Sequence, residues 1–227
     1  MPKVDALGAR VERVEIGGQI GWLKRVEKMG VRHRIVKGDP RQLFEAERAA
    51  YRSLQQKALP FPKFIAEDAD HFVMEDAGPT LFHILRSEGA DSPRFRKAVL
   101  GAAEELAGIH LAGVSHGRPA LRDICWKDGR ITFIDLERYA PRRNSRDGHA
   151  WDVLIFLYSL AVDLKGDLEI AEAARDAYRA ADRKDIWAQA EQKIALVKRF
   201  DFALRPLGRL LSHKRDFRPL GPFLDMF

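Results

Sequence analysis

Apolar and polar residues alternate along the start of the chain, in two runs separated by a pair of glycines. Residues 11–16 and 20–26 each place apolar side chains at every second position, which is the period of a half-buried strand. Gly17 and Gly18 between them suit a two-residue turn, so the pattern predicts a β-hairpin. The side chains expected to face inward are Val14, Ile16 and Trp22, or their neighbours in register.

A helix is expected next, because the following segment begins with capping residues. Asp39 suits the N-cap, Pro40 the first helical position, and Gln42 lies three residues after the cap, as in a capping box. The residues that follow, up to position 56, are mostly strong helix formers. The apolar positions expected at helical spacing are Leu43, Ala46, Ala50 and Leu54.

The rest of the chain changes from strand-like to helical patterns. Residues 63–67 and 71–75 predict a second strand pair, and residues 124–126 and 131–134 a short hairpin. Helices are predicted at 95–112, 152–164, 168–181 and 186–212, the last one broken or kinked at Pro206. The fold class that follows is α+β, with a small β-rich lobe over residues 1–76 and a helical lobe over residues 77–227.

Composition narrows the class of protein. Of 227 residues, 46% are hydrophobic and 32% are charged, so the chain can form a core and is not intrinsically disordered. Its single cysteine, Cys125, excludes a disulfide framework and a zinc site built from several thiolates. Neither a signal peptide nor a membrane-spanning run is recognisable, so we expect a cytoplasmic protein.

The charge balance favours anionic partners. The chain has 39 Lys and Arg against 33 Asp and Glu, a formal charge of +6. Without a recognition motif for nucleic acid, no nucleic-acid partner is expected. Residues 198–215 interleave basic with apolar residues, which suits either core packing with a solvated basic face or peripheral contact with an anionic membrane.

A histidine and two aspartates surround the predicted short hairpin. His116 and Asp123 precede it, and Asp135 follows the apolar run Thr-Phe-Ile, so its side chain is expected at the end of a buried strand. Two carboxylates in a water-accessible site suit Mg²⁺, which keeps several waters and takes one or two carboxylates together with phosphates. The alternative for Asp123 is a local hydrogen-bonding role in a turn.

Several short motifs follow one another in a fixed order. They are WLKR at 22–25, EAERAAYRSL at 45–54, VMED at 73–76, HG at 116–117, IDLE at 134–137 and WDVLIFLYSL at 151–160. Together they resemble the protein-kinase-like superfamily, and within it the bacterial lipopolysaccharide-core (Kdo-type) sugar kinases. The resemblance covers most of the chain and implies a two-lobed fold that binds ATP and Mg²⁺ between its lobes and phosphorylates a sugar or glycolipid hydroxyl.

The resemblance also implies roles for single residues in the first lobe. Lys24 would bind the phosphates of ATP, and Glu47 would pair with that lysine. Glu75 lies in the interlobe hinge whose backbone takes the adenine edge, and Asp135 is the magnesium-binding aspartate. Lys37 is the rival to Lys24, but it lies ten positions before Glu47 with a helix cap between them, which leaves little chain for a crossover.

In the second lobe the resemblance concerns a catalytic loop. His116 begins this loop and is expected to have a structural role, and Asp123 occupies the second metal-ligand position. Asp152 would brace the loop from below, although it also suits the N-cap of the helix predicted at 152–164.

Two departures from the family's pattern affect the chemistry. Arg118 stands where the family has the aspartate that accepts the acceptor's proton, and Asp123 stands where it usually has asparagine. Either the acid has moved to Asp123, as metal ligand, base or both, or the base is lost and the protein is a pseudokinase. Positioned base catalysis contributes about 10²–10⁴-fold, so its loss would not by itself abolish phosphoryl transfer. The second departure is the missing glycine-rich loop, for which residues 17–21 are at best a shortened substitute.

Overall fold

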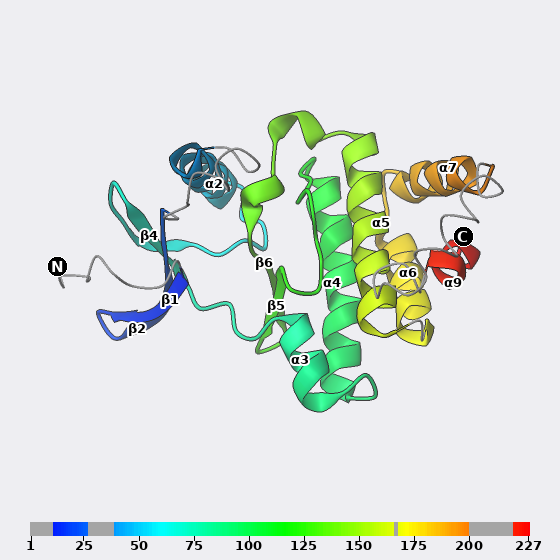
Figure 1. Cartoon of the computed structure of the whole chain (residues 1–227), viewed down its shortest axis with the longest axis horizontal. Coiled ribbons are helices and arrows are strands. Elements are labelled where there is room, and N and C mark those ends of the chain that lie inside the picture. The colour runs from blue at the N-terminus through cyan, green and yellow to red at the C-terminus, as the bar shows by residue number, and fades with distance from the viewer. Residues whose placement is uncertain (1–10, 27–38, 166–167, 200–219) are drawn as a thin grey trace. The chain divides into compact units, whose positions relative to one another are not determined.

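The structure is a computed structural model that describes residues 11–26, 39–165, 168–199 and 220–227 (Figure 1). The chain divides into two compact units. The first comprises Met1–Ala77 and Asp135–Glu137, and the second comprises Gly78–Ile134 and Arg138–Phe227. The predicted α+β class is confirmed, since strands and helices are both present.

The first unit contains a four-stranded antiparallel sheet. Its strands are β1 (Val11–Ile16), β2 (Gln19–Arg25), β3 (Phe64–Glu67) and β4 (His71–Glu75), in the order β1-β2-β4-β3. Both predicted strand pairs are therefore confirmed. Gly17 and Gly18 form the tight β1–β2 turn with φ angles of 59° and 79°, which glycine adopts without steric cost. Trp22 is 38% exposed, whereas its neighbours Gly21, Leu23 and Lys24 are buried.

Helix α2 (Pro40–Gln55) accompanies this sheet and begins where predicted. The Asp39 side chain accepts a hydrogen bond from the backbone N–H of Arg41 at 3.0 Å. The predicted buried face is partly wrong, because Leu43 and Ala46 are exposed. The buried residues are Pro40, Phe44, Glu47, Ala50, Tyr51 and Leu54. The helix is rotated by about one position because its large aromatic side chains pack on the sheet, with the Phe44 and Phe72 rings stacked at 5.1 Å.

The second unit is mainly helical, with one small hairpin (Figure 1). Its elements are α3 (Leu81–Glu88), α4 (Pro93–Leu111), β5 (Ile124–Lys127), β6 (Arg130–Phe133), the 3-10 turn η2 (Pro141–Arg143), α5 (Arg146–Asp163), α6 (Glu169–Ala181), α7 (Ile186–Arg199) and α9 (Leu220–Asp225). The predicted hairpin is present as β5 and β6. A further 3-10 turn, η1 (Leu136–Arg138), begins within the first unit. The sequence did not predict α3, α9 or the two 3-10 turns.

Helix α5 begins at Arg146, earlier than predicted. The Ser145 side chain is its N-cap and accepts a hydrogen bond from the backbone N–H of Gly148 at 3.2 Å. The interpretation of Asp152 as an N-cap is therefore wrong, because Asp152 lies inside the helix and is 1% exposed. Lys37, Pro206 and the basic stretch beyond residue 199 lie outside the described residues.

None of the helices in the described part of the chain combines the length and hydropathy that crossing a membrane requires.

Candidate functional site

Lys24 lies on β2, one of the two inner strands of the first unit's sheet. Its cross-strand partner on β4 is Phe72, so the two side chains face the same side of the sheet. Phe72 stacks on Phe44 of α2, which means that α2 covers this side. The strand register thus directs the lysine towards the helix, and its side chain is only 10% exposed.

Glu47 of α2 is the partner of this lysine. The Lys24 Nζ and Glu47 Oε1 atoms lie 2.6 Å apart, and the Glu47 side chain is 1% exposed. The pairing of Lys24 with Glu47 is the one predicted from the sequence. Burial removes water from both charges, and this cost offsets much of the attraction between them, so the pair is not explained by stability alone. Buried charge pairs of this kind are typical of sites that bind charged groups.

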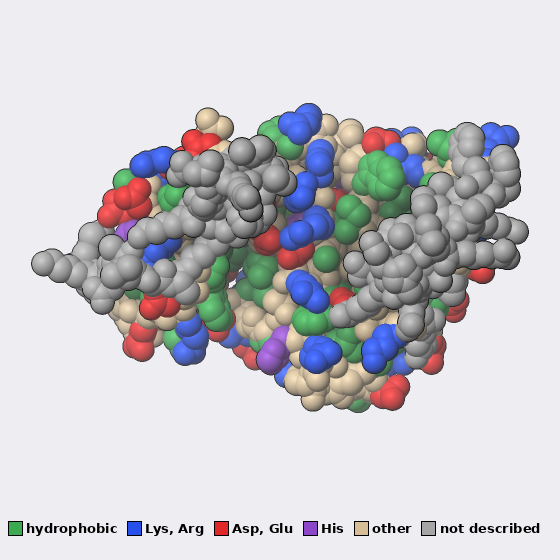
Figure 2. Space-filling view, viewed as in Figure 1, with side chains coloured by type: hydrophobic (Ala, Val, Ile, Leu, Met, Phe, Trp, Pro, Cys, Tyr) green, Lys and Arg blue, Asp and Glu red, His purple; other side chains and the backbone are tan. Residues whose placement is uncertain are grey.

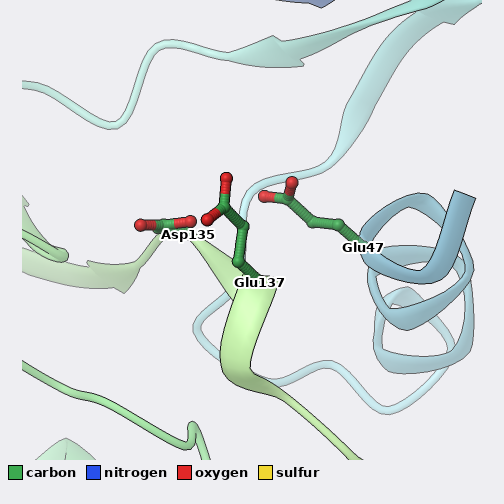
Figure 3. Close-up of side chains that lie close together, drawn as sticks. All are labelled: Glu47, Asp135 and Glu137. Carbon is green, nitrogen blue, oxygen red and sulfur yellow. The ribbon is translucent and has the colours of Figure 1, made fainter. Parts of the chain in front are cut away.

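Asp135 and Glu137 complete a cluster of charges around the same ammonium group. The Lys24 Nζ atom lies 3.8 Å from an oxygen of each carboxylate. Oxygen atoms of Glu47, Asp135 and Glu137 lie within 4.8 Å of one another (Figure 3). Glu47 reaches in from α2, and the other two come from the segment after β6. We call these four residues the Lys24 cluster.

Glu137 is the member of the Lys24 cluster that sequence reasoning missed. The available signal was the second acidic residue of the IDLE motif, two positions after Asp135. With one cation and three carboxylates, the cluster has a formal charge of −2. The Asp135 and Glu137 side chains are 27% and 34% exposed, so both carboxylates are partly accessible to water and ions, although the Asp135 Oδ1 atom itself is buried. Hard oxygen donors of this kind fit Mg²⁺.

Tyr51 fixes the backbone of Asp135. The Asp135 N–H donates a hydrogen bond to the Tyr51 hydroxyl at 2.9 Å, and Tyr51 is fully buried. Asp135 has a φ of 65°, in the left-handed region that aspartate tolerates better than most residues. Burial, and then the charge of Glu47, raise the pKa of Tyr51, so its hydroxyl stays neutral and can act as the acceptor. The conformation of Asp135 is thereby tied to α2.

Glu75, predicted for the hinge, is the last residue of β4. Its backbone N–H donates to the carbonyl oxygen of Lys63 at 2.9 Å. Next to it, the Asp76 carboxylate accepts a hydrogen bond from the Trp22 indole at 3.0 Å. These contacts hold the end of β4 against β2 and β3 in the first unit, and the adenine-binding role of Glu75 stays a prediction.

In the second unit, Asp152 holds the loop that begins at His116. One Asp152 oxygen accepts a hydrogen bond from the His116 backbone N–H at 2.6 Å, and the other accepts from the Gly117 N–H at 2.9 Å. This is the bracing contact that the resemblance implies for Asp152. A buried carboxylate with two backbone donors fixes the loop firmly, since each bond is charge-assisted.

His116 is fully buried and both of its ring nitrogens are engaged. Its Nε2 lies 2.9 Å from the carbonyl oxygen of Ile134, which can only accept, so Nε2 carries the proton. Its Nδ1 then accepts a hydrogen bond from the Arg118 backbone N–H at 3.3 Å. His116 is therefore a neutral, structural residue that orients the loop.

Arg118 and Asp123 form an ion pair within the second unit. The Arg118 Nε atom lies 3.3 Å from Asp123 Oδ2, with the Asp123 side chain 8% exposed and the Arg118 side chain 46% exposed. The carbonyl oxygen of Asp123 accepts a hydrogen bond from the Ile134 N–H at 2.8 Å, which anchors it to the hairpin. Because Asp123 and Asp135 belong to different units, their convergence on one metal ion stays a prediction.

A buried polar network that the sequence did not reveal surrounds the loop. The His110 and His149 rings stack at 4.6 Å, and His110 Nδ1 lies 2.7 Å from the Tyr178 hydroxyl. The Ser115 hydroxyl donates to the Arg143 carbonyl oxygen at 2.5 Å, so His149 Nδ1 must donate to Ser115 Oγ at 2.8 Å. Burial, followed by the nearby His110, lowers the pKa of His149 to about 4.

Comparison with known proteins supplies a relative but no activity. No family model matches the chain. The chain is 32% identical over 152 residues to an uncharacterized protein of Haemophilus influenzae, and the match covers 66% of this chain. It spans 62% of the length of that relative, which is less than two thirds.

Proposed function

We propose that the protein is an ATP-dependent phosphotransferase that binds Mg²⁺-ATP at the Lys24 cluster and phosphorylates a hydroxyl group of a sugar or glycolipid. The observation that supports this most is the buried Lys24–Glu47 ion pair, with Asp135 and Glu137 each 3.8 Å from the same ammonium group. A lysine held by one carboxylate beside two accessible carboxylates suits a ligand that carries both phosphates and a divalent cation.

Each member of the cluster has a role in this proposal. Lys24 contacts the phosphates, and Glu47 fixes the lysine through the 2.6 Å ion pair. Asp135 and Glu137 hold Mg²⁺, which when bound neutralises phosphate charge. The formal charge of −2 on the cluster explains why ATP would bind with its metal rather than alone, because free phosphates would be repelled.

The second unit supplies the candidate chemistry at the acceptor. Asp152 fixes the backbone at His116 and Gly117, and the chain then leads to Arg118 and Asp123. In the proposed enzyme Asp123 accepts the proton of the acceptor hydroxyl. A sugar or glycolipid acceptor and peripheral contact with the inner face of a membrane are taken from the resemblance and complete the proposal.

The second candidate function is a pseudokinase that binds nucleotide without transferring phosphate. The observation that favours it is the Arg118–Asp123 ion pair at 3.3 Å. A guanidinium group beside the carboxylate competes with an acceptor hydroxyl for the same oxygen atom. A nucleotide-binding or scaffolding protein would tolerate this arrangement.

The nucleotide site is tested by calorimetry of ATP binding with and without Mg²⁺. Asp135→Asn is the informative variant, because asparagine also tolerates a φ of 65° and keeps the backbone N–H that binds Tyr51. Asp128→Asn, in the exposed β5–β6 turn with a φ of 51°, is the matched control. We expect Asp135→Asn to lose the Mg²⁺-dependent affinity and the control to keep it. Unchanged affinity in Asp135→Asn would remove the site assignment.

The choice between enzyme and pseudokinase is tested by ADP release with ATP, Mg²⁺ and a lipopolysaccharide-core acceptor. The wild type should release ADP, and Arg118→Asp should not release it faster. Turnover only in the Arg118→Asp variant would overturn the enzyme proposal and support the pseudokinase.

A further inference from the structure

Arginine residues gather around Gly117 in the second unit. The Arg143 guanidinium donates a hydrogen bond to the Gly117 carbonyl oxygen at 3.2 Å. A side chain at Gly117, which has a φ of 96°, would collide with the backbone of Arg138. Arg118 follows directly, and its side chain is 46% exposed. The Arg143 guanidinium and the backbone of Arg138 therefore lie beside Gly117, the residue that precedes Arg118 in the chain.

The segment that carries most of these arginines is held in place by hydrogen bonds. Ser115 donates from its hydroxyl to the Arg143 carbonyl oxygen at 2.5 Å, and from its backbone N–H to the Asn144 side chain at 2.9 Å. Asn144 in turn donates to the Tyr139 hydroxyl at 3.4 Å. These contacts fix the backbone on both sides of Arg142, so the segment can present its guanidinium groups at low entropic cost.

The charge of this segment is not balanced locally. Residues 138–146 contain four arginines and no acidic residue, whereas the whole chain has 39 basic against 33 acidic residues. Within the described residues, no acidic side chain forms an ion pair with Arg138, Arg142 or Arg143, and the first two are exposed. Figure 2 shows a row of Lys and Arg side chains in the middle of the view, over the part of the second unit that leads into α5.

We propose that Arg138, Arg142 and Arg143, which we call the arginine site, bind a phosphate monoester carried by the acceptor sugar. The proposal rests on the phosphotransferase function proposed above and specifies its acceptor as one that is already anionic. The rigid fork of one guanidinium group binds two phosphate oxygens at once. Several arginines without acidic partners therefore suit a ligand with two negative charges. The anion would lie beside Gly117, in the loop that leads to Arg118 and Asp123.

The test measures binding of glucose 6-phosphate and glucose by calorimetry, without nucleotide. The double variant Arg138→Gln/Arg142→Gln removes two exposed charges. Arg86→Gln/Arg130→Gln removes two other exposed charges of the same unit and serves as the control. We expect glucose 6-phosphate to bind the wild type and the control alike, to bind the double variant about tenfold or more weakly, and to bind more tightly than glucose.

Three results would overturn the proposal. The first is equal affinity of the wild type for glucose and glucose 6-phosphate. The second is an equal loss of glucose 6-phosphate affinity in the two double variants. The third is that neither glucose 6-phosphate nor inorganic phosphate binds the wild type more tightly than Arg138→Gln/Arg142→Gln. Binding to phosphatidic-acid vesicles without binding of glucose 6-phosphate would contradict the sugar as the source of the phosphate. Since no nucleotide is present, a failed ATP-binding experiment would refute the phosphotransferase while leaving the measured anion site in place.

Discussion

The bracing contact of Asp152 allows a sharp prediction within the second unit. Replacing Asp152 by asparagine keeps the size of the side chain but removes its charge and turns one oxygen into an NH₂ group. The native oxygens accept from the N–H groups of His116 and Gly117 at 2.6 and 2.9 Å, and the residue is 1% exposed. In the variant, one of the two backbone N–H groups faces the asparagine NH₂ group, which is also a donor, in either orientation of the amide.

The magnitude follows from the number of bonds. A hydrogen bond to a charged group contributes about 1.5–3 kcal/mol, and a stranded buried donor costs about 1–3 kcal/mol. Asparagine keeps one neutral bond of about 1 kcal/mol. One N–H group is thus stranded, at a cost of about 1–3 kcal/mol, and the other exchanges a charged bond for a neutral one, at a cost of about 0.5–2 kcal/mol. The free energy of unfolding should therefore fall by about 1.5–5 kcal/mol, a large share of the roughly 5–15 kcal/mol typical of a folded protein.

Asp147→Asn is the matched control, because it lies on the same helix and its side chain is 64% exposed. Its ion pair with Lys193 is a surface contact, which contributes about 0–1 kcal/mol. Urea unfolding of both variants gives the two free energies, and amide hydrogen exchange at His116 and Gly117 reports the loop itself. Exchange should accelerate at these two amides in Asp152→Asn alone. If Asp152→Asn were no less stable than Asp147→Asn, the bracing role would be wrong.

Two further predictions concern the buried network and the backbone of Asp135. His149 has a pKa of about 4 when folded against about 6.5 when unfolded, so the unfolded chain binds the proton more tightly. The free energy of unfolding should therefore fall as the pH drops from about 6.5 to about 4, and a His149→Asn variant with the same pH slope would contradict this. Tyr51→Phe strands the Asp135 N–H and should lower the unfolding free energy by about 1–3 kcal/mol, measured in urea. Tyr139→Phe, whose hydroxyl accepts a longer bond of 3.4 Å, is the control and should cost less.

Local signals were sufficient to predict the strands, whereas the Lys24–Glu47 pair was predicted from the resemblance to the kinase-like superfamily. The alternation in β1 and β2, and the glycine pair between them, reflect constraints within a few residues. The same holds for Asp39 and the start of α2. The structure contains the Lys24–Glu47 contact that the resemblance implied. The spacing of the residues alone argued only against Lys37 as the alternative lysine.

Features that depend on tertiary packing could not be predicted in this way. The buried face of α2 follows the rings of Phe44 and Tyr51, which pack on Phe72 of another element. Helix α5 begins after the Ser145 cap, and its first turn has no apolar periodicity from which a helix could be predicted. No spacing in the sequence indicates that His110 stacks on His149, because the two residues belong to separate helices.

The residues at positions 118 and 123 and the arginine site point to the same acceptor chemistry in the proposed enzyme. Where the superfamily that the sequence resembles has an aspartate and an asparagine, this chain has Arg118 and Asp123, so the formal charge of the pair is zero and not −1. A loop with an unpaired carboxylate repels an anionic acceptor, whereas the Arg118–Asp123 ion pair at 3.3 Å does not. Arg138, Arg142 and Arg143 add positive charge beside the same loop. In the proposed enzyme, an acceptor that already carries a phosphate would thus meet attraction where the sugar kinases that the sequence resembles would present a negative charge. On this proposal, Arg118 in place of Asp would reflect the charge of the acceptor and not a loss of activity.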